Sequence, residues 1–242
     1  MSQHRLRNLS RWIHRLAAGY ATMHQTEPLS DRWGHDRGTP LDRFYVERFL
    51  ESHRQEIRGH VLEIEDRYYT DDYGCDVERS EVLDINPSNP KATIVADLQS
   101  ADAIPSNHFD CFILTQTLQY VYHLQAAVEH CHRVLRPGGV LLATVPAVSR
   151  IDPAIVDYWR FTTASCSALF GGVFGAENVT VHSYGNVLAA IASLSGWAQE
   201  EMSASELSAN DSYFPIIIVV HAVKPGRAPS QPRAGSVAIS VG

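Results

Sequence analysis

Short apolar runs alternate with helical patterns through most of the chain. The runs expected to form strands are residues 60–65, 81–85, 93–96, 110–114, 140–145, 179–183 and 216–223. Apolar side chains recur at helical spacing in the segments 124–135, 163–170 and 187–199. A run that is apolar almost throughout, such as 110–114, is typical of a parallel strand buried on both faces. Strands that alternate with helices predict a doubly wound α/β fold with a seven-stranded, mostly parallel sheet.

The end of the helix expected at 124–135 is marked by the sequence Arg136-Pro137-Gly138-Gly139. Glycine suits the left-handed residue that commonly closes a helix, and proline cannot continue the hydrogen-bond ladder. We therefore expect a glycine cap here, followed by the strand that starts at Val140.

Three segments surround the alternating region. Residues 1–27 combine apolar residues at helical spacing with arginines, and this predicts a basic amphipathic helix. It is expected to cap the domain or to form an oligomer contact, with binding to a membrane surface as the alternative. A second helix is expected at 41–57. We divide the chain into an N-terminal helical cap or lid at 1–58, a sheet domain at 59–223 and a disordered tail rich in Pro, Gly, Ser and Ala at 224–242.

Composition narrows the class of protein. A length of 242 residues suits one α/β domain, and the formal net charge of −7 argues against a general nucleic-acid binder. No stretch has the roughly 20 apolar residues of a membrane-spanning helix, and the N-terminus lacks the apolar core of a signal peptide. A cytoplasmic location and no stable membrane insertion are expected. The four cysteines form no C-x-x-C pair, which favours reduced thiols, and we expect no metal site.

Acidic residues follow two of the expected strands. Glu63 lies near the end of the first, and Asp84 comes 21 positions later, next to Ile85 at the tip of the second. We expect all three in the cofactor site. In doubly wound folds an acid about 20 residues beyond the first strand accepts hydrogen bonds from a ribose diol. The open alternative is a solvated loop acid.

The ends of the third and fourth strands supply further candidates. Asp97 and Leu98 are placed to bind an adenine, through the carboxylate and a backbone amide respectively. Asp97 is equally well suited to cap a helix. Thr115 and Gln116 end the fourth strand, where a doubly wound sheet holds its ligand.

These motifs together resemble one family. The runs Val82–Pro87, Ala96–Leu98, Phe109–Asp110 and Leu135–Gly139 match, in order and spacing, class I S-adenosyl-L-methionine (SAM)-dependent methyltransferases of the type 11 kind. The resemblance covers residues 60–146 well. It implies a Rossmann-like sheet with an antiparallel last strand, SAM as cofactor, and a small-molecule methyl acceptor. Residues 33–50 and 157–162 are similar to a subgroup linked to sugar, polysaccharide or natural-product biosynthesis.

One departure from the family concerns its glycine-rich loop. The family pattern places glycines after the first strand, whereas residues 63–69 here are Glu-Ile-Glu-Asp-Arg-Tyr-Tyr. Glycines at that point let the backbone approach the cofactor's methionine portion. Glu65 and Asp66 are candidates to bind its ammonium group instead. The alternative is that the cofactor lies differently or binds weakly.

The methyl acceptor is expected above the strand ends. The candidate side chains for binding it are Arg37, Tyr45, Tyr120, Tyr158, Trp159 and Arg160. Aromatic rings stack on a sugar or flat ring, and arginine pairs with an anion. The aromatic residues at 158–159 are equally compatible with core packing. Asp157 and His182 are the candidates for a general base, although a lone histidine is more often structural.

Three functions remain in competition at this point. The leading hypothesis is methyl transfer to an oxygen of a sugar or natural product, by an enzyme whose homo-oligomerisation is left open. The altered loop is also compatible with a degenerate domain that binds or scaffolds a partner. A nicotinamide enzyme is disfavoured, because the G-x-G-x-x-G phosphate turn is missing.

Overall fold

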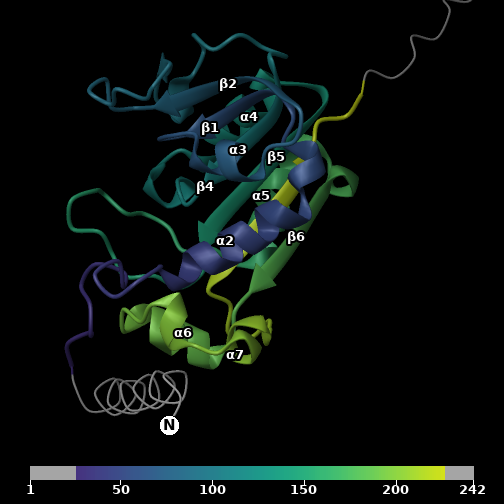
Figure 1. Ribbon diagram of the computed structural model, residues 1–242. Helices are drawn as coiled ribbons and strands as arrows, with labels where there is room; N and C mark the ends of the chain where they lie inside the picture. Colours follow the sequence, from purple (N-terminus) through teal and green to yellow (C-terminus); the bar gives the residue numbers. More distant parts are fainter. Residues whose placement is uncertain (1–25, 227–242) are drawn as a thin grey trace, which may run out of the picture.

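Seven strands hydrogen-bond into one sheet in the computed structural model, which describes residues 26–226 (Figure 1). They are β1 Gly59–Ile64, β2 Val77–Asp84, β3 Ile94–Val95, β4 Phe109–Thr115, β5 Leu135–Pro146, β6 Val179–Tyr184 and β7 Ile217–Val223. The strand order is β3-β2-β1-β4-β5-β7-β6, and only β7 runs antiparallel to its neighbours. This confirms the predicted α/β fold, with its mostly parallel sheet and antiparallel last strand.

Helices cover both faces of the sheet. They are α2 Leu41–Ser52, α3 Tyr68–Tyr73, α4 Leu124–Val134, α5 Thr163–Phe174, α6 Val187–Leu194 and α7 Ala204–Ser208. Short 3₁₀ turns lie at Arg54–Glu56 (η1), Leu98–Ser100 (η2), Leu118–Tyr120 (η3), Ala176–Asn178 (η4) and Gln199–Glu201 (η5).

The pleat of the central strands divides the apolar core into two layers. In β4, Phe112 and Leu114 face one side and pack with α4 and α5, whereas Cys111 and Ile113 face the other and pack with α2 and α6. Successive side chains of a strand point to opposite faces, so a strand that is apolar throughout builds both layers at once. Figure 1 shows α2 lying across the face of the sheet with α6 below it.

The end of α4 differs from the prediction. The helix ends at Val134, and Leu135 is already extended and pairs with Phe109 of β4. Gly138 has the expected positive φ of 83°, but it lies within β5, where the register shifts. The glycine therefore lies in an irregular first part of β5 and does not cap the helix, because Leu135 already pairs with β4 three residues before it.

Two other differences concern helix lengths. The helix expected at 187–199 ends at Leu194, since Gly196 turns the chain with a φ of 74°. The patterns did not predict α3 and α7, which have 6 and 5 residues and are too short to show helical periodicity.

Several sequence predictions lie outside the described residues. The amphipathic helix expected at 1–27 falls almost entirely within residues 1–25, and most of the expected tail falls within 227–242. Among residues 26–226, no helix combines the length and the apolar character that crossing a membrane requires.

Candidate functional site

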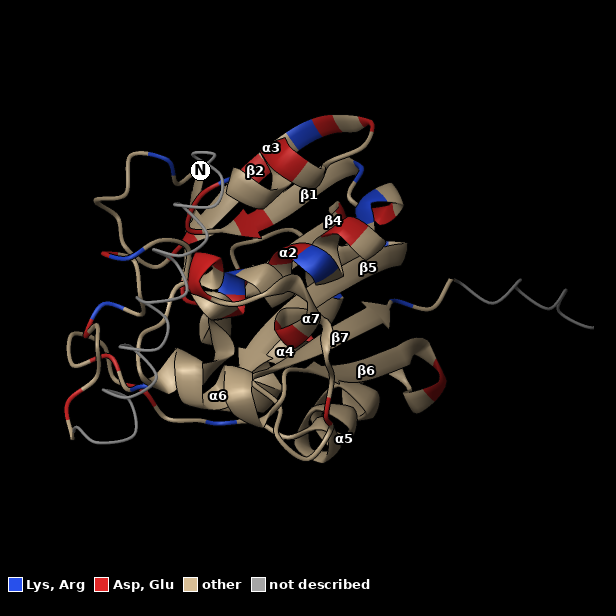
Figure 2. Ribbon diagram, turned by 60° about the horizontal axis from the view of Figure 1, so that its bottom comes forward, with Lys and Arg blue, Asp and Glu red and all other residues tan. Residues whose placement is uncertain are grey.

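A cavity of about 740 Å³ opens at the carboxyl ends of β1, β2, β3 and β4. All nine residues predicted at the strand tips line it: Glu63, Glu65, Asp66, Asp84, Ile85, Asp97, Leu98, Thr115 and Gln116. Parallel strands bring their carboxyl ends to the same edge of a sheet, which explains why residues up to 53 positions apart in the sequence meet here. Acidic residues (red) mark the end of β1 and the neighbouring α3 in Figure 2.

Asp84 is held in a defined orientation at the tip of β2. Its Oδ1 accepts a hydrogen bond from the backbone N–H of Asn86 at 2.8 Å, and its Oδ2 accepts one from Asn89 Nδ2 at 2.6 Å. The same Asn89 amide donates to the backbone carbonyl of Glu65 at 2.7 Å. Asn89 therefore joins the loops after β1 and β2. A carboxylate has about four lone-pair sites, so Asp84 keeps acceptor capacity for a ligand.

Asp97 caps the short turn η2 and also faces the cavity. Its Oδ1 accepts from the backbone N–H of Gln99 at 2.9 Å, and the Gln99 side-chain amide lies 3.3 and 3.2 Å from its two oxygens. The capping interpretation of Asp97 is thus confirmed. Its proposed contact with an adenine would share the same carboxylate. Leu98 is buried beneath it in the core.

Glu63 organises the loop after β1. Its carboxylate accepts hydrogen bonds from the backbone N–H groups of Tyr69 and Thr70 at 2.9 and 2.7 Å, and from the Thr70 hydroxyl at 2.6 Å. The side chain is almost fully buried, and burial raises the pKa of Glu63 to about 7. Glu63 therefore anchors the start of α3, and this occupies the carboxylate that the sequence assigned to a cofactor.

Glu65 makes the turn that a glycine makes in the family pattern. Its φ is 70°, in the left-handed region that non-glycine residues seldom adopt. Its neighbour Asp66 accepts from the backbone N–H of Tyr68 at 2.9 Å and from Lys91 Nζ at 3.2 Å. Both acids line the cavity, and Glu65 is the more exposed of the two. The backbone path of the loop is thus achieved without glycine.

The segment after β4 carries a polar atom without a partner. Gln119 donates from Nε2 to the backbone carbonyl of Gln116 at 2.8 Å, which fixes the orientation of the amide. Among residues 26–226, its Oε1 then has no hydrogen-bond partner, although the residue is only 4% exposed and lines the cavity. An unpaired buried acceptor is costly, so a water molecule or a ligand that brings a donor to this oxygen would stabilise the wall.

Most of the predicted acceptor-binding residues lie elsewhere. Tyr120 lines the cavity, as predicted. Tyr45 is 1% exposed in the core, where its ring stacks on Tyr184, and this removes it from the site. Arg37 forms an ion pair with Glu201 away from the cavity wall. α2 buries one face against the sheet, which is why an aromatic residue of the expected lid becomes core.

The prediction that residues 157–160 face the methyl acceptor is also corrected. Arg160 and Asp157 form a two-pronged ion pair at 2.5 and 2.9 Å, and Arg160 donates to the backbone carbonyl of Arg150 at 3.0 Å. Trp159 donates from Nε1 to the carbonyl of Val121 at 2.9 Å. These contacts fasten the loop after β5, and none of the predicted residues of this segment, Asp157, Tyr158, Trp159 and Arg160, lines the cavity.

His182 is exposed on β6, at the edge of the sheet farthest from the strand tips that line the cavity. Neither predicted base therefore faces the cavity. Sequence reasoning missed the polar groups that do, His35 and Asp42 of the N-terminal segment. Burial raises the pKa of Asp42 above its usual value. The only available signal was their place in the segment identified as a lid.

Comparison with known proteins agrees with this geometry. Residues 58–143 match the family model described as "Methyltransferase domain". This match supports a class I SAM-dependent methyltransferase domain over residues 58–143. Two solved structures share its fold: a SAM-dependent methyltransferase from Archaeoglobus fulgidus, with a TM-score of 0.51 and 12% identity, and one from Mesorhizobium loti, with a TM-score of 0.52 and 17% identity. They cover 75% and 76% of this chain, and 94% and 99% of their own chains are matched.

Sequence relatives match a shorter stretch of the chain. The ubiquinone/menaquinone biosynthesis C-methyltransferase UbiE of Pseudomonas fluorescens is 38% identical over 66 residues, or 27% of this chain. The UbiE protein of Pseudomonas aeruginosa strain PAO1 matches to the same extent. In both cases the chain spans 25% of the relative's length.

The cavity fits SAM, the cofactor of this domain. Its volume of about 740 Å³ is in the range of small-molecule sites, roughly 300–1,000 Å³. Asp84 offers an oriented carboxylate for a ribose diol, and Glu65 and Asp66 offer negative charge for an ammonium group. The donor and acceptor chemistry of the wall is therefore complementary to an amino-acid nucleoside.

Proposed function

We propose that this chain is an enzyme that transfers a methyl group from SAM to a small-molecule acceptor, at an oxygen of a sugar or natural product. The observation that carries the proposal is the cavity in which Asp84, Glu65 and Asp66 line the strand tips beside the unpaired Oε1 of Gln119. The methyltransferase domain supports the reaction class, and the resemblance of residues 33–50 and 157–162 supports the acceptor class.

The cofactor supplies an electrophilic methyl on a sulfonium, so the protein's part is binding, alignment and proton transfer. In this proposal Asp84 accepts hydrogen bonds from the ribose hydroxyls, and Asp97 and Leu98 contact the adenine. Glu65 and Asp66 bind the ammonium group, while Thr115 and Gln116 line the wall near it. Positioning of two reactants contributes on the order of 7–11 kcal/mol in well-oriented reactions.

The acceptor proton needs a base on the wall of the cavity. Asp42 takes this role in the proposal, because its carboxylate lines the cavity and burial raises its pKa, which makes it a better proton acceptor. His35 lies on the same wall. Gln119 Oε1 accepts the hydrogen bond of a donor group on the acceptor, and Tyr120 contacts its ring. Asp157 and His182 are not proposed again, because both lie off the cavity wall.

A carbon acceptor is the second candidate. The UbiE relatives are named C-methyltransferases, and the cavity rim carries apolar residues that suit a ring with an apolar tail. Ile155 and Ile85 both line the cavity, and they are 50% and 66% exposed. The carbon chemical shift of a transferred ¹³C-methyl group separates an O-methyl from a C-methyl product.

The test of the cofactor site is Asp84→Ala. Loss of two hydrogen bonds to a charged acceptor costs roughly 3 kcal/mol or more, so the affinity for S-adenosylhomocysteine should fall about 160-fold or more. Isothermal titration calorimetry measures it. Asp102→Ala, which removes an exposed acid outside the cavity, is the control and should bind as the unaltered chain does.

The opposite results have a clear meaning. An unaltered chain that gives no heat with S-adenosylhomocysteine would favour the alternative of a degenerate binding module. Binding that survives Asp84→Ala unchanged would place the ribose elsewhere in the cavity.

A further inference from the structure

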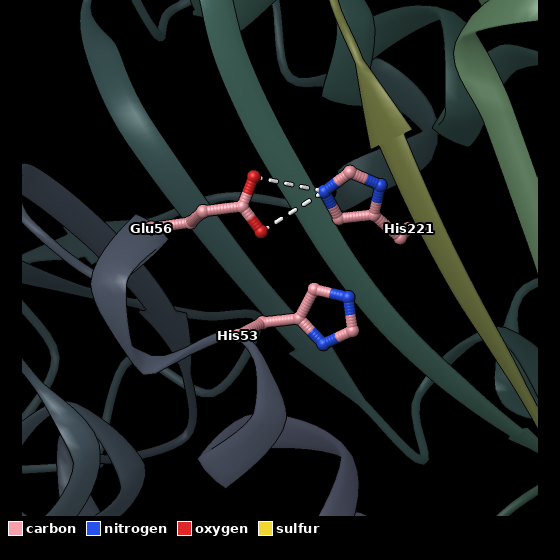
Figure 3. Close-up of side chains that lie close together, drawn as sticks. All are labelled: His53, Glu56 and His221. Atoms are coloured by element: carbon pink, nitrogen blue, oxygen red, sulfur yellow. Dashed lines mark hydrogen bonds and ion pairs between the residues drawn. The ribbon is translucent and has the colours of Figure 1, made fainter.

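Two histidines and a glutamate meet on the α2 face of the sheet, outside the proposed site (Figure 3). His53 follows the last residue of α2, Glu56 ends the turn η1, and His221 comes from β7. One ligand atom from each residue can be chosen so that all three lie within 4.8 Å of one another. None of the three lines the cavity.

Hydrogen bonds fix which nitrogen of His53 is free. Nδ1 lies 2.9 Å from the backbone carbonyl of Phe49 and 3.0 Å from the Ser52 hydroxyl. A carbonyl oxygen only accepts, so Nδ1 carries the proton and donates it. The lone pair of the neutral ring is then on Nε2. Histidine ligands of metals commonly donate their other ring N–H to a backbone carbonyl in this way.

Glu56 and His221 already converge on one point. Nε2 of His221 lies 3.0 Å from both carboxylate oxygens of Glu56. The imidazole rings of His53 and His221 are stacked, with centroids 4.8 Å apart. The side chains of His221 and Glu56 are 20% and 35% exposed, so water can reach a bound ion. Within residues 26–226, no lysine or arginine forms an ion pair with Glu56.

A second group of the same composition provides a contrast. His60, Glu81 and His108 also lie within reach of one another. There, however, Arg79 pairs with Glu81 at 2.6 Å, and the side chains of His60 and Glu81 are only 8% and 10% exposed. A positive neighbour and deep burial both oppose a dication, so this second group is a structural cluster.

We propose that His53, Glu56 and His221 form a binding site for a divalent transition metal of the zinc class. Imidazole nitrogen and carboxylate oxygen are the ligands such ions take, at about 2.0–2.2 Å. Ligand atoms of one tetrahedral ion lie roughly 3.3 Å apart at such bond lengths. The 3.0 Å between Glu56 and His221 is close to this value, and a ligand atom of His53 lies within 4.8 Å of both. Water fills the fourth position.

Binding would change the tautomer of His221. The hydrogen through which Nε2 faces Glu56 moves to Nδ1 of the neutral ring by way of solvent, and Nε2 then offers its lone pair to the metal. The ion would clamp the end of α2 to β7. The opposite end of α2, at Asp42 and Val46, lines the cavity, so the metal would stabilise the helix that forms one cavity wall.

The experiment titrates the metal-free full-length chain with Zn²⁺ in a calorimeter. We expect one ion per chain, and weakening by about tenfold or more in both His53→Ala and His221→Ala. His108→Ala, which removes a histidine of the second group, should bind as the unaltered chain does. Co²⁺ should give visible absorption of a tetrahedral site without a thiolate charge-transfer band.

Several results would overturn the proposal. These are no stoichiometric Zn²⁺ binding by the unaltered chain, binding that survives both His53→Ala and His221→Ala, or a thiolate band that disappears in Cys75→Ser. Each variant replaces a partly exposed side chain, so folding can be verified by circular dichroism before titration.

Discussion

Glu65 shows how one residue can replace a glycine loop. With a φ of 70° it makes the turn by accepting backbone strain, which costs a non-glycine residue roughly 1–2 kcal/mol. What the chain obtains in return is a carboxylate on the cavity wall, beside Asp66. The family pattern has backbone alone at this point, so a side chain here changes what the loop can bind.

The variant Glu65→Gly separates the effect of backbone strain on stability from the effect of the carboxylate on ligand binding. Relief of strain should raise the free energy of unfolding by about 1 kcal/mol, partly offset by the entropy of glycine. Loss of the carboxylate should at the same time weaken S-adenosylhomocysteine binding. Urea denaturation and calorimetry measure the two quantities. Asp76→Gly is the matched control, because Asp76 has a φ of 57° but does not line the cavity. Its affinity should not change. Equal affinity in Glu65→Gly would exclude the ammonium role.

At the scale of elements, α3 depends on a carboxylate from the neighbouring strand. Glu63 of β1 accepts the N–H groups of Tyr69 and Thr70 in the first turn of the helix. A six-residue helix has little stability of its own, so this tertiary cap accounts for its presence. Burial of Glu63 opposes its ionisation, and burial is the largest of the influences on its pKa.

The stability of the chain should therefore depend on the charge of Glu63. Its pKa rises from 4.5 to about 7 on folding, so the folded state favours the protonated acid. The resulting stabilisation is complete below pH 4.5 and disappears as the pH rises through about 7. The difference amounts to roughly 3 kcal/mol. Glu63→Gln stays neutral at every pH. As the pH rises from 4.5 to 7.5, the free energy of unfolding of the unaltered chain should therefore fall relative to that of Glu63→Gln.

Urea unfolding at a series of pH values measures this difference. Thr70→Val is the control, because it removes one hydrogen bond to Glu63 and keeps the titrating carboxylate. It should retain the pH dependence. A constant difference between Glu63→Gln and the unaltered chain at all pH values would show that the pKa of Glu63 does not change on folding.

These elements show what the sequence could predict. Strand positions and the nine strand-tip residues followed from apolar runs, because parallel strands deliver their ends to one edge. α3 was not predicted, since its cap is a side chain of β1, the strand before it. The predictions of the base and of the acceptor-binding residues were wrong for a similar reason. Tyr45, Asp157 and Arg160 have the right chemistry, but packing against the sheet and the ion pair within the loop direct them away from the cavity.

On the scale of the whole molecule, the N-terminal segment is fastened to a distant part of the chain. Leu29 donates to the carbonyl of Ser195 at 2.8 Å, and Gln199 donates to the carbonyl of Thr39 at 2.7 Å. Pro40 and Ala198 form an isolated bridge between the two segments. Trp33, His35 and Pro40 line the cavity, so these contacts hold one of its walls.

Gly196→Ala should release this wall. A Cβ at Gly196 would lie 2.4 Å from the carbonyl oxygen of Ser30, and the φ of 74° adds strain, so residues 29–40 must move. We expect faster tryptic cleavage at Arg32 and Arg37 and weaker binding of S-adenosylhomocysteine. Gly138→Ala is the matched control, because its φ is 83° but its Cβ would meet no atom within 4 Å. It should lose stability by about 1 kcal/mol without faster cleavage at those arginines. If both variants bind and resist trypsin equally, the contact between these two segments does not hold the wall, and the cavity rests on the sheet alone.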